Sequence, residues 1–173
     1  YKKRMVMMIL GIGGCTALVL AGFGINDSVA GIADHQFSQI ERYHMTAAFS
    51  EELEGKKLED FKLEYGDELS NIAVLQQASV NASGVSGKSG VSKTCNLMVT
   101  NDDNITGAVN FTDGEKKLSY PDKGEALINN KLADMLGIKA GDEIKIKYDD
   151  TKEVTLKVSG VYRNYVSNYI YIS

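Results

Sequence analysis

The sequence is poor in the residues that mark several classes of protein. It contains one proline, two cysteines and two histidines in 173 residues. A collagen-like chain, a proline-rich linker and a disulfide-stapled scaffold are therefore excluded. The formal net charge of −4 disfavours nucleic-acid binding, which favours a basic surface. Hydrophobic residues make up 43% and charged residues 24%, close to globular averages, so we expect the chain to fold.

Charged and apolar residues are unevenly distributed along the chain. Residues 1–4 carry a charge of +3, residues 5–25 carry none, and residues 26–173 carry −7. A helix as long as the uncharged run would measure about 32 Å, enough to cross a hydrocarbon core of about 30 Å. We therefore expect a membrane helix. Its N-terminus should be cytoplasmic, because basic residues stay on the inner side, and the chain from about residue 26 should be extracytoplasmic.

A cleaved signal peptide is the alternative interpretation of residues 5–25, but the apolar run exceeds the ~7–15 residues of a signal peptide's apolar region. Within the run, Gly13, Ala17 and Ala21 recur four residues apart on one helix face. Small residues at this spacing let two helix backbones approach closely. We expect these residues to pack against other membrane helices, unless the segment is merely rich in glycine.

The helical pattern continues beyond the membrane segment. Apolar residues keep helical spacing from residue 29 to residue 43, and no proline interrupts them. We predict one unbroken helix to about Arg42, a stiff element that can carry motion between the membrane and a folded domain. The expected organisation is a membrane helix with its extension at 1–42 and an extracytoplasmic domain at 43–173, with possible subdomains at 43–100 and 101–173.

The chain beyond this helix has the pattern of an α+β domain. Asn129 or Asn130 can cap a helix over residues 131–136, and Gly137 stands where such a helix commonly ends. Residues 58–65 should form a short helix or an irregular segment. The expected strands are residues 44–50, 72–82, 93–100, 125–128, 143–148, 154–161 and 169–172.

One segment matches a chemical motif without its context. Residues 82–89 (ASGVSGKS) satisfy a relaxed phosphate-loop pattern. A true phosphate loop needs a helix after it, so that backbone N–H groups and the helix N-terminus face the phosphates. Here a β-like run follows, and the expected topology places the segment outside the cell. We therefore expect a β-hairpin tip and no nucleotide binding.

Other residues that often carry chemistry lack partners in the sequence. His35 and His44 have no cysteine or carboxylate at a metal-ligand spacing, so no metal site is expected. Cys95 lies in a predicted strand with no histidine after it, which favours a buried small hydrophobe over a nucleophile. Cys15 lies in the membrane segment and cannot pair with it. The sequence therefore predicts neither an enzyme nor a cofactor.

Four of the nine tyrosines lie close together near the end of the sequence: Tyr162, Tyr165, Tyr169 and Tyr171. An aromatic cluster can form a surface for a partner. The same spacing also fits the alternate faces of one strand, with two rings buried. Both interpretations stay open.

Three runs of sequence are similar to one family. Residues 124–146 (GEALINNKLADMLGIKAGDEIKI) and 154–173 (VTLKVSGVYRNYVSNYIYIS) resemble the extracytoplasmic domain of FtsX-like permeases, the MacB-type group of ABC transporters. The run KKRMVMMILGIGGCTALVLAGFGINDS resembles their first membrane helix. The resemblance implies an α+β fold of the MacB periplasmic core domain type. In that fold the membrane helix continues into a mixed α/β domain with a small β-barrel-like C-terminal part.

The resemblance also implies a role without catalysis. FtsX-like permeases form homodimers, or pair with a second permease, and bind a separate cytoplasmic ATPase whose movements reach the outer domain through the membrane helices. The implied role is a permease subunit in a bacterial cell membrane, in contact with lipid, that exports or handles peptides, lipids or lipoproteins. Two alternatives stay open: a singly anchored extracellular ligand-binding module without an ATPase partner, and an anchored enzyme, for which no residue gives positive evidence.

Overall fold

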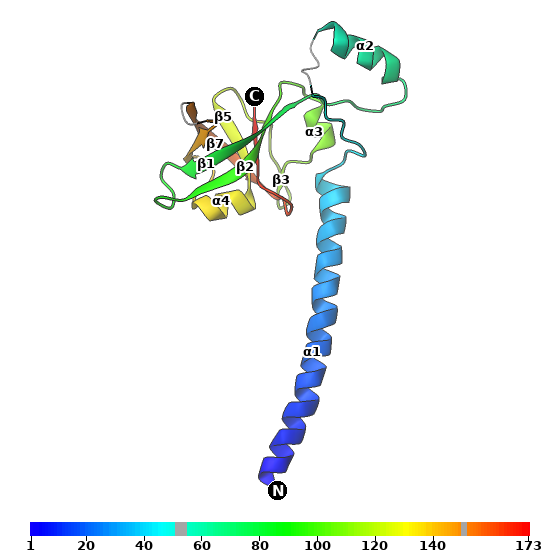
Figure 1. The fold of residues 1–173 in the computed structure, drawn as a ribbon, viewed down its shortest axis with the longest axis vertical. Coiled ribbons are helices and arrows are strands. Elements are labelled where there is room, and N and C mark those ends of the chain that lie inside the picture. The colour runs from blue at the N-terminus through cyan, green and yellow to red at the C-terminus, as the bar shows by residue number, and fades with distance from the viewer. Residues whose placement is uncertain (51–54, 150–151) are drawn as a thin grey trace.

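A long helix stands apart from the folded domain. The structure, a computed structural model, describes residues 1–50, 55–149 and 152–173. Helix α1 (Lys2–Asp34) passes directly into η1 (His35–Ile40), a turn of π-helix. No residue of α1 is buried, and Figure 1 shows the helix extending from one side of the domain. The predicted unbroken helix is confirmed, although it ends at Ile40 rather than Arg42.

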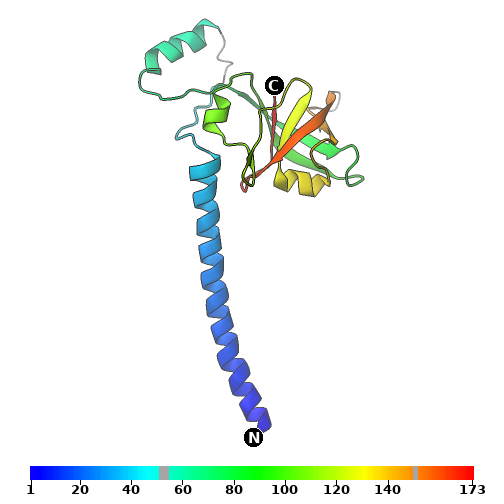
Figure 2. The same ribbon diagram turned by 180° about the vertical axis from the view of Figure 1, so that it is seen from behind.

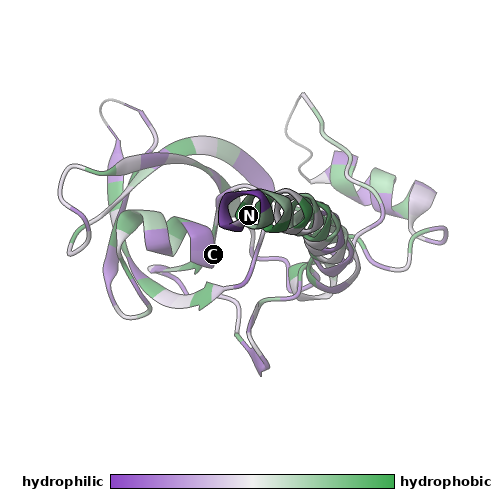
Figure 3. Ribbon diagram, turned by 90° about the horizontal axis from the view of Figure 1, so that it is seen from below, coloured by the Kyte–Doolittle hydropathy of each residue, from purple (hydrophilic) through white to green (hydrophobic). Residues whose placement is uncertain are grey.

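This helix is long enough to cross a membrane and to continue beyond it. The 39 residues from Lys2 to Ile40 hold the one candidate span found in the described part of the chain. Figure 3 shows hydrophobic colours along the helix and a hydrophilic N-terminal end. A helix of this length measures about 58 Å, so nearly half of it extends past a hydrocarbon core of about 30 Å.

The remaining elements form the domain and a projecting arm. Helix α2 buries none of its residues and lies away from the strands (Figure 1). In chain order the elements are α2 (Lys56–Tyr65), β1 (Gln76–Gly84), β2 (Ser92–Val99), α3 (Ile105–Ala108), β3 (Thr112–Asp113), β4 (Lys116–Lys117), β5 (Glu125–Asn129), α4 (Asn130–Leu136), β6 (Glu143–Lys147), β7 (Glu153–Tyr162) and β8 (Tyr169–Ile172).

Six strands close into a barrel in the order β1-β2-β8-β5-β7-β6, with β6 returning to β1. The β2–β8 and β5–β7 pairs are parallel, and the other neighbours are antiparallel. Strands from 43–100 and from 101–173 thus build one barrel, so the two possible subdomains are not separate bodies. The predicted mixed α/β domain with a barrel-like part is confirmed, with β1 and β2 added to the barrel.

Aliphatic side chains fill the inside of the barrel. Along β6, Ile144 and Ile146 are buried while the charged residues between and beside them are not, the alternation expected of a strand with one wet face. Helix α4 lies across one opening of the barrel (Figures 1 and 3). It adds Leu132 and Leu136 to the same core, so barrel and helix form one packed body.

The strand predicted at residues 44–50 is wrong. This segment has no regular secondary structure, and its side chains are exposed. Strands need a neighbour to satisfy their backbone groups, and a closed barrel offers no free edge. The strand predicted at residues 169–172 has these bounds, and the other predicted strands are present with shifted ends. The helix predicted at residues 131–136 starts one residue earlier, and of the two alternatives at residues 58–65 the helix is present.

The turn after α4 ties the helix to the barrel wall. Gly137 has φ 70°, the left-handed conformation that commonly ends a helix, as predicted. The Gly141 N–H donates to the carbonyl of Val158, and the Val158 N–H donates to the carbonyl of Asp142, both at 2.8 Å. The end of α4 and the start of β6 are therefore fixed against β7.

Replacing Ile144 with alanine tests the barrel core. The side chain is fully buried, and its truncation leaves a cavity, so the free energy of unfolding should fall by about 2–5 kcal/mol. Val154→Ala on β7, where the side chain is 47% exposed, should cost no more than about 1 kcal/mol. Chemical denaturation in detergent solution measures both changes. Equal losses would contradict the assignment of the barrel interior.

Candidate functional site

Backbone hydrogen bonds fix the end of the long helix to the domain. The Asn110 N–H donates to the carbonyl of Ile40, and the Arg42 N–H donates to the carbonyl of Ala108, each at 2.8 Å. Between these bonds, Glu41 and Val109 form an antiparallel bridge. The Ile40 side chain is 1% exposed. The last helical residue is therefore packed inside the domain.

Gln36 is a buried amide one turn before this clamp. Its Nε2 donates to Asn164 Oδ1 at 2.7 Å and to Glu41 Oε1 at 3.0 Å. Its Oε1 accepts from the Tyr165 N–H at 3.0 Å. Both N–H groups and the oxygen of the amide are thus used, and the residue has no exposed surface. Because an unpaired buried amide is costly, these bonds hold the helix against the loop between β7 and β8.

The π-helical turn belongs to this contact. The Glu41 N–H donates to the carbonyl of Gln36 at 2.8 Å, across five residues rather than four. Single π-turns are rare and often mark functional sites. Here the turn contains Gln36 and Ile40, the residues of η1 that are buried in the domain. We call the contacts of Gln36 and Ile40 with the domain the junction.

The loop between β7 and β8, residues 163–168, is held by two asparagines at the start of α4. Asn130 Oδ1 accepts from the Asn164 N–H at 3.1 Å. Asn129 donates its Nδ2 to the carbonyl of Ser167 at 3.2 Å. The junction is thereby connected to α4 through this loop.

The prediction that Asn129 or Asn130 caps α4 is confirmed for the position of Asn129, but the expected side-chain bond is not formed. Asn129 occupies the N-cap position but makes no side-chain cap bond. Its Oδ1 instead accepts from the Tyr169 N–H at 3.0 Å. The amide groups that could satisfy the helix end are engaged by the loop and by β8, because that loop carries backbone groups that also need partners.

The tyrosine cluster divides between the core and the junction. Tyr162 and Tyr171 are 1% and 6% exposed and pack edge to face against each other and against Phe111. The predicted partner surface is therefore wrong for these two rings, which follow the alternative with two rings buried. Tyr165 and Tyr169 keep part of their surface exposed, and their use by a partner stays a prediction.

One ring contact and one tyrosine hydrogen bond lie next to the junction. The rings of His35 and Tyr165 meet edge to face with their centroids 5.7 Å apart. Tyr43 Oη donates to Glu41 Oε2 at 3.1 Å. Burial and the Glu41 carboxylate raise the pKa of Tyr43 to about 12. The phenol therefore stays neutral near pH 7 and keeps its proton for this hydrogen bond.

The segment with a phosphate-loop pattern forms a hairpin tip, as predicted. We call residues 85–91 the β1–β2 tip. Lys88 Nζ donates to the carbonyl of Asp134 at 2.8 Å, near the C-terminal end of α4. That end of a helix carries partial negative charge, whereas phosphates bind at the positive N-terminal end. The geometry gives nucleotide binding no support.

The other sequence candidates lie apart from the junction. Cys95 is buried in the core, and burial raises the pKa of its thiol to about 12, which removes the reactive thiolate. Within residues 1–50, 55–149 and 152–173, no group of three or more His, Cys, Asp and Glu side chains could hold a metal ion. Gly13, Ala17 and Ala21 lie exposed along α1, and their packing against other helices stays a prediction.

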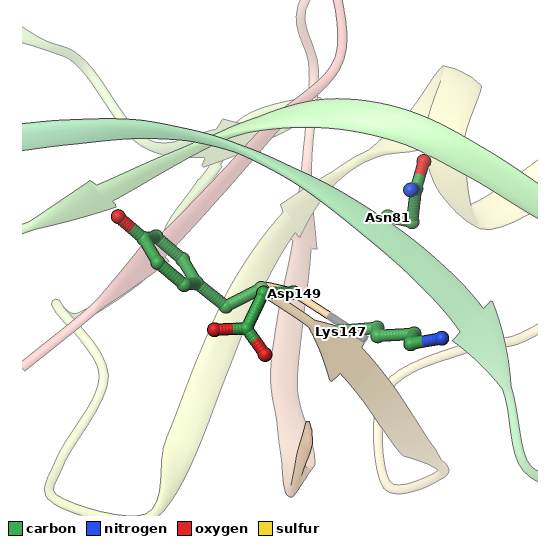
Figure 4. A pocket seen from close by; sticks show the side chains of 4 residues that line it. Asn81, Lys147 and Asp149 are labelled. Carbon is green, nitrogen blue, oxygen red and sulfur yellow. The ribbon is translucent and has the colours of Figure 1, made fainter. Parts of the chain in front are cut away.

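A small surface cavity lies where β1 and β6 pair. It is lined by Asn81, Lys147, Tyr148 and Asp149. Figure 4 shows the labelled side chains pointing in different directions. They do not converge on one point, so the junction is the stronger candidate for a functional site.

Sequence reasoning did not identify the junction. The available signal was Gln36 itself, a polar residue on the apolar face of a helix between Ile32 and Ile40. A polar residue at such a position needs a buried partner. Its partner Asn164 lies 128 residues away in the sequence and follows no pattern that would connect the two.

The chain is similar to a known family and to a solved structure. A family model described as the MacB-like periplasmic core domain matches residues 5–173. Among solved structures, a domain of a candidate permease protein from Porphyromonas gingivalis is similar with a TM-score of 0.42 and 10% sequence identity. The similarity covers 64% of this chain and 54% of that structure, so the chain spans about half the length of its match. No curated protein matches the sequence.

A double-mutant cycle tests the amide contact at the junction. Gln36→Leu and Asn164→Leu each leave buried polar groups unpaired, so each should lower the free energy of unfolding by about 1–3 kcal/mol. The double variant should lose less than the sum, since one shared bond is counted once. Gln39→Leu, an exposed glutamine three residues along, is the matched control and should be additive with Asn164→Leu. Additivity in the Gln36 cycle would contradict the contact.

The state of Cys95 can be read by thiol labelling. With its pKa near 12, we expect almost no thiolate at pH 8 and no alkylation of the folded protein in a Cys15→Ser background. Labelling should appear when the protein is unfolded in denaturant, and an added Ser89→Cys on the β1–β2 tip should label at once. Rapid alkylation of Cys95 in the folded protein would contradict its burial and would support a role as a nucleophile.

Proposed function

We propose a function from one premise: the chain belongs to the family of MacB-like periplasmic core domains, whose model matches residues 5–173. The match supports an ABC-type permease family with a membrane helix and a periplasmic core domain. We propose that it transmits movement between a cytoplasmic ATPase and the outer domain. The transmitted movement serves the export or handling of peptides, lipids or lipoproteins.

The observation that carries this proposal is the stiffness of the connection. One continuous helix runs from Lys2 to Ile40, and its last turn is held by backbone bonds at Ile40 and by side-chain bonds at Gln36. Two attachment points fix the direction of a rod as well as the position of its end. A tilt or shift of the membrane helix would therefore move the barrel as well.

Topology and partners follow from the helix. We propose that Lys2, Lys3 and Arg4 stay on the cytoplasmic side, where the ATPase acts, and that residues from about 26 are extracytoplasmic. The small residues Gly13, Ala17 and Ala21 would contact a second copy or another permease within the lipid. A role without catalysis is supported by the buried, protonated thiol of Cys95.

Purification of the full-length protein from its native host tests the proposal. We expect a stoichiometric ABC-type ATPase to co-purify. In nanodiscs, ATP should then change hydrogen exchange in the barrel of the wild-type protein. Gln36→Leu should keep the ATPase bound and its basal ATP turnover unchanged, but reduce the ATP-dependent response of the barrel. Gln39→Leu should leave that response intact.

Two results would contradict this account. Absence of an ATPase from the intact membrane protein would favour a singly anchored ligand-binding module. A full ATP-dependent response in the Gln36→Leu variant would show that the junction does not transmit the movement.

A further inference from the structure

Helix α4 is attached to a different loop at each end. Its N-terminal end meets the loop at residues 163–168, which bonds to the junction. Its C-terminal end meets the β1–β2 tip. Figures 1 and 2 both show this tip at the end of the barrel that faces away from α1. The helix therefore lies between the junction and a hairpin on the far side of the barrel.

Close packing makes the attachment at the C-terminal end specific. The Lys88 N–H donates to the carbonyl of Leu136 at 2.8 Å, and Lys88 Nζ donates to the carbonyl of Asp134 at 2.8 Å. Both bonds satisfy carbonyls that a helix leaves unpaired at its end. A Cβ atom on Gly87 would collide with the Leu136 carbonyl oxygen. The tip can take this position only because residue 87 is glycine.

The attachment at the N-terminal end uses side chains that would otherwise cap the helix. Asn130 Oδ1 accepts from the Asn164 N–H at 3.1 Å. The same Asn164 accepts the bond from Gln36 through its Oδ1. One asparagine therefore contacts both α4 and η1, the last turn of the long helix.

Helix α4 is one short body packed against the barrel core. Three of its seven residues, Leu132, Ala133 and Leu136, are buried in the barrel core. Because these side chains are packed together, a displacement at one end of the helix must also shift the other end. Packed and hydrogen-bonded elements of this kind can carry coupling between distant sites when they have two arrangements.

We infer that α4 couples the β1–β2 tip to the junction, so that displacement of the tip changes the hold of the domain on α1. The inference rests on the proposed transmission of movement and names the route by which the far end of the barrel takes part in it. A molecule that contacts and displaces the tip then changes the contacts between the domain and the membrane helix. By thermodynamic reciprocity, movement of the helix changes the tip by the same free energy.

Substitutions at the tip test the coupling in the full-length permease in nanodiscs. Gly87→Ala acts as a wedge that separates the tip from α4 and removes no charge. Lys88→Met deletes the ammonium group and with it the bond to the Asp134 carbonyl. It keeps the aliphatic stem and the backbone N–H that bonds the Leu136 carbonyl. Ser89→Ala is the control, because Ser89 is an exposed tip residue. Hydrogen exchange by mass spectrometry follows peptides that contain residues 163–167 and residues 85–90.

The expected result is a response at the distant end. Gly87→Ala and Lys88→Met should speed exchange at residues 163–167 by roughly 2- to 30-fold, the usual range of such coupling. Gln36→Leu should speed exchange at residues 85–90 by a similar factor. Ser89→Ala should leave residues 163–167 unchanged, and strand β6 should stay protected in every variant, which shows that the barrel is folded.

The coupling would be overturned if each substitution changed exchange only at its own end of α4. A response in one direction alone would also overturn it, because coupling of binding or opening equilibria is reciprocal. Either outcome leaves the proposed function intact provided that Gln36→Leu still reduces the ATP-dependent response of the barrel. Loss of both effects would remove the proposed function as well.

Discussion

The arrangement of helix and domain depends on the buried amide of Gln36. A glutamine enclosed by protein must keep its hydrogen bonds, because no water can replace them. Its partners are a carboxylate on the same chain segment and two groups of the 163–168 loop. The barrel cannot turn about the end of α1 without breaking these bonds. A second attachment at Ile40 removes the remaining freedom to pivot.

The barrel provides the rigid body that this contact needs. Its strands close on themselves, so no edge is left to fray, and α4 fills one opening with aliphatic side chains. The turn at Gly137–Asp142 then fixes α4 to β7 through reciprocal bonds between Gly141, Asp142 and Val158. A displacement applied at one loop is passed on because little in this core can deform. The projecting arm at α2 buries none of its residues and takes no part in that rigidity.

The sequence alone predicted the local elements better than their arrangement. Apolar spacing identified the long helix, and strand-like runs bounded by turn residues identified six of the strands. Closure of the barrel and its two parallel pairs could not be read from it, since they join residues far apart in sequence. The strand expected at residues 44–50 failed because no neighbour was available to pair with it. The family resemblance supplied the barrel that periodicity could not.

The candidate site was beyond the reach of sequence patterns. Gln36 gave a weak signal, as a polar residue on an apolar helix face, and Asn164 gave none. Asn129 and Asn130 were recognised as capping residues from their position, but their amides bond the 163–168 loop and β8 instead. Tyrosines close together in sequence were separated by folding into a buried pair and a partly exposed pair. Side-chain hydrogen bonds between distant segments depend on the completed fold.

If the junction holds, α1 and the barrel move as one unit. Spin labels on Val29→Cys in the helix and Val154→Cys in the barrel, both at exposed positions, would measure their separation by pulsed electron paramagnetic resonance in a Cys15→Ser background. The full-length permease in nanodiscs, with labelled chains diluted by unlabelled ones, should give one narrow distance distribution that nucleotide leaves unchanged. A broad distribution, or one that shifts when ATP is added, would contradict the account.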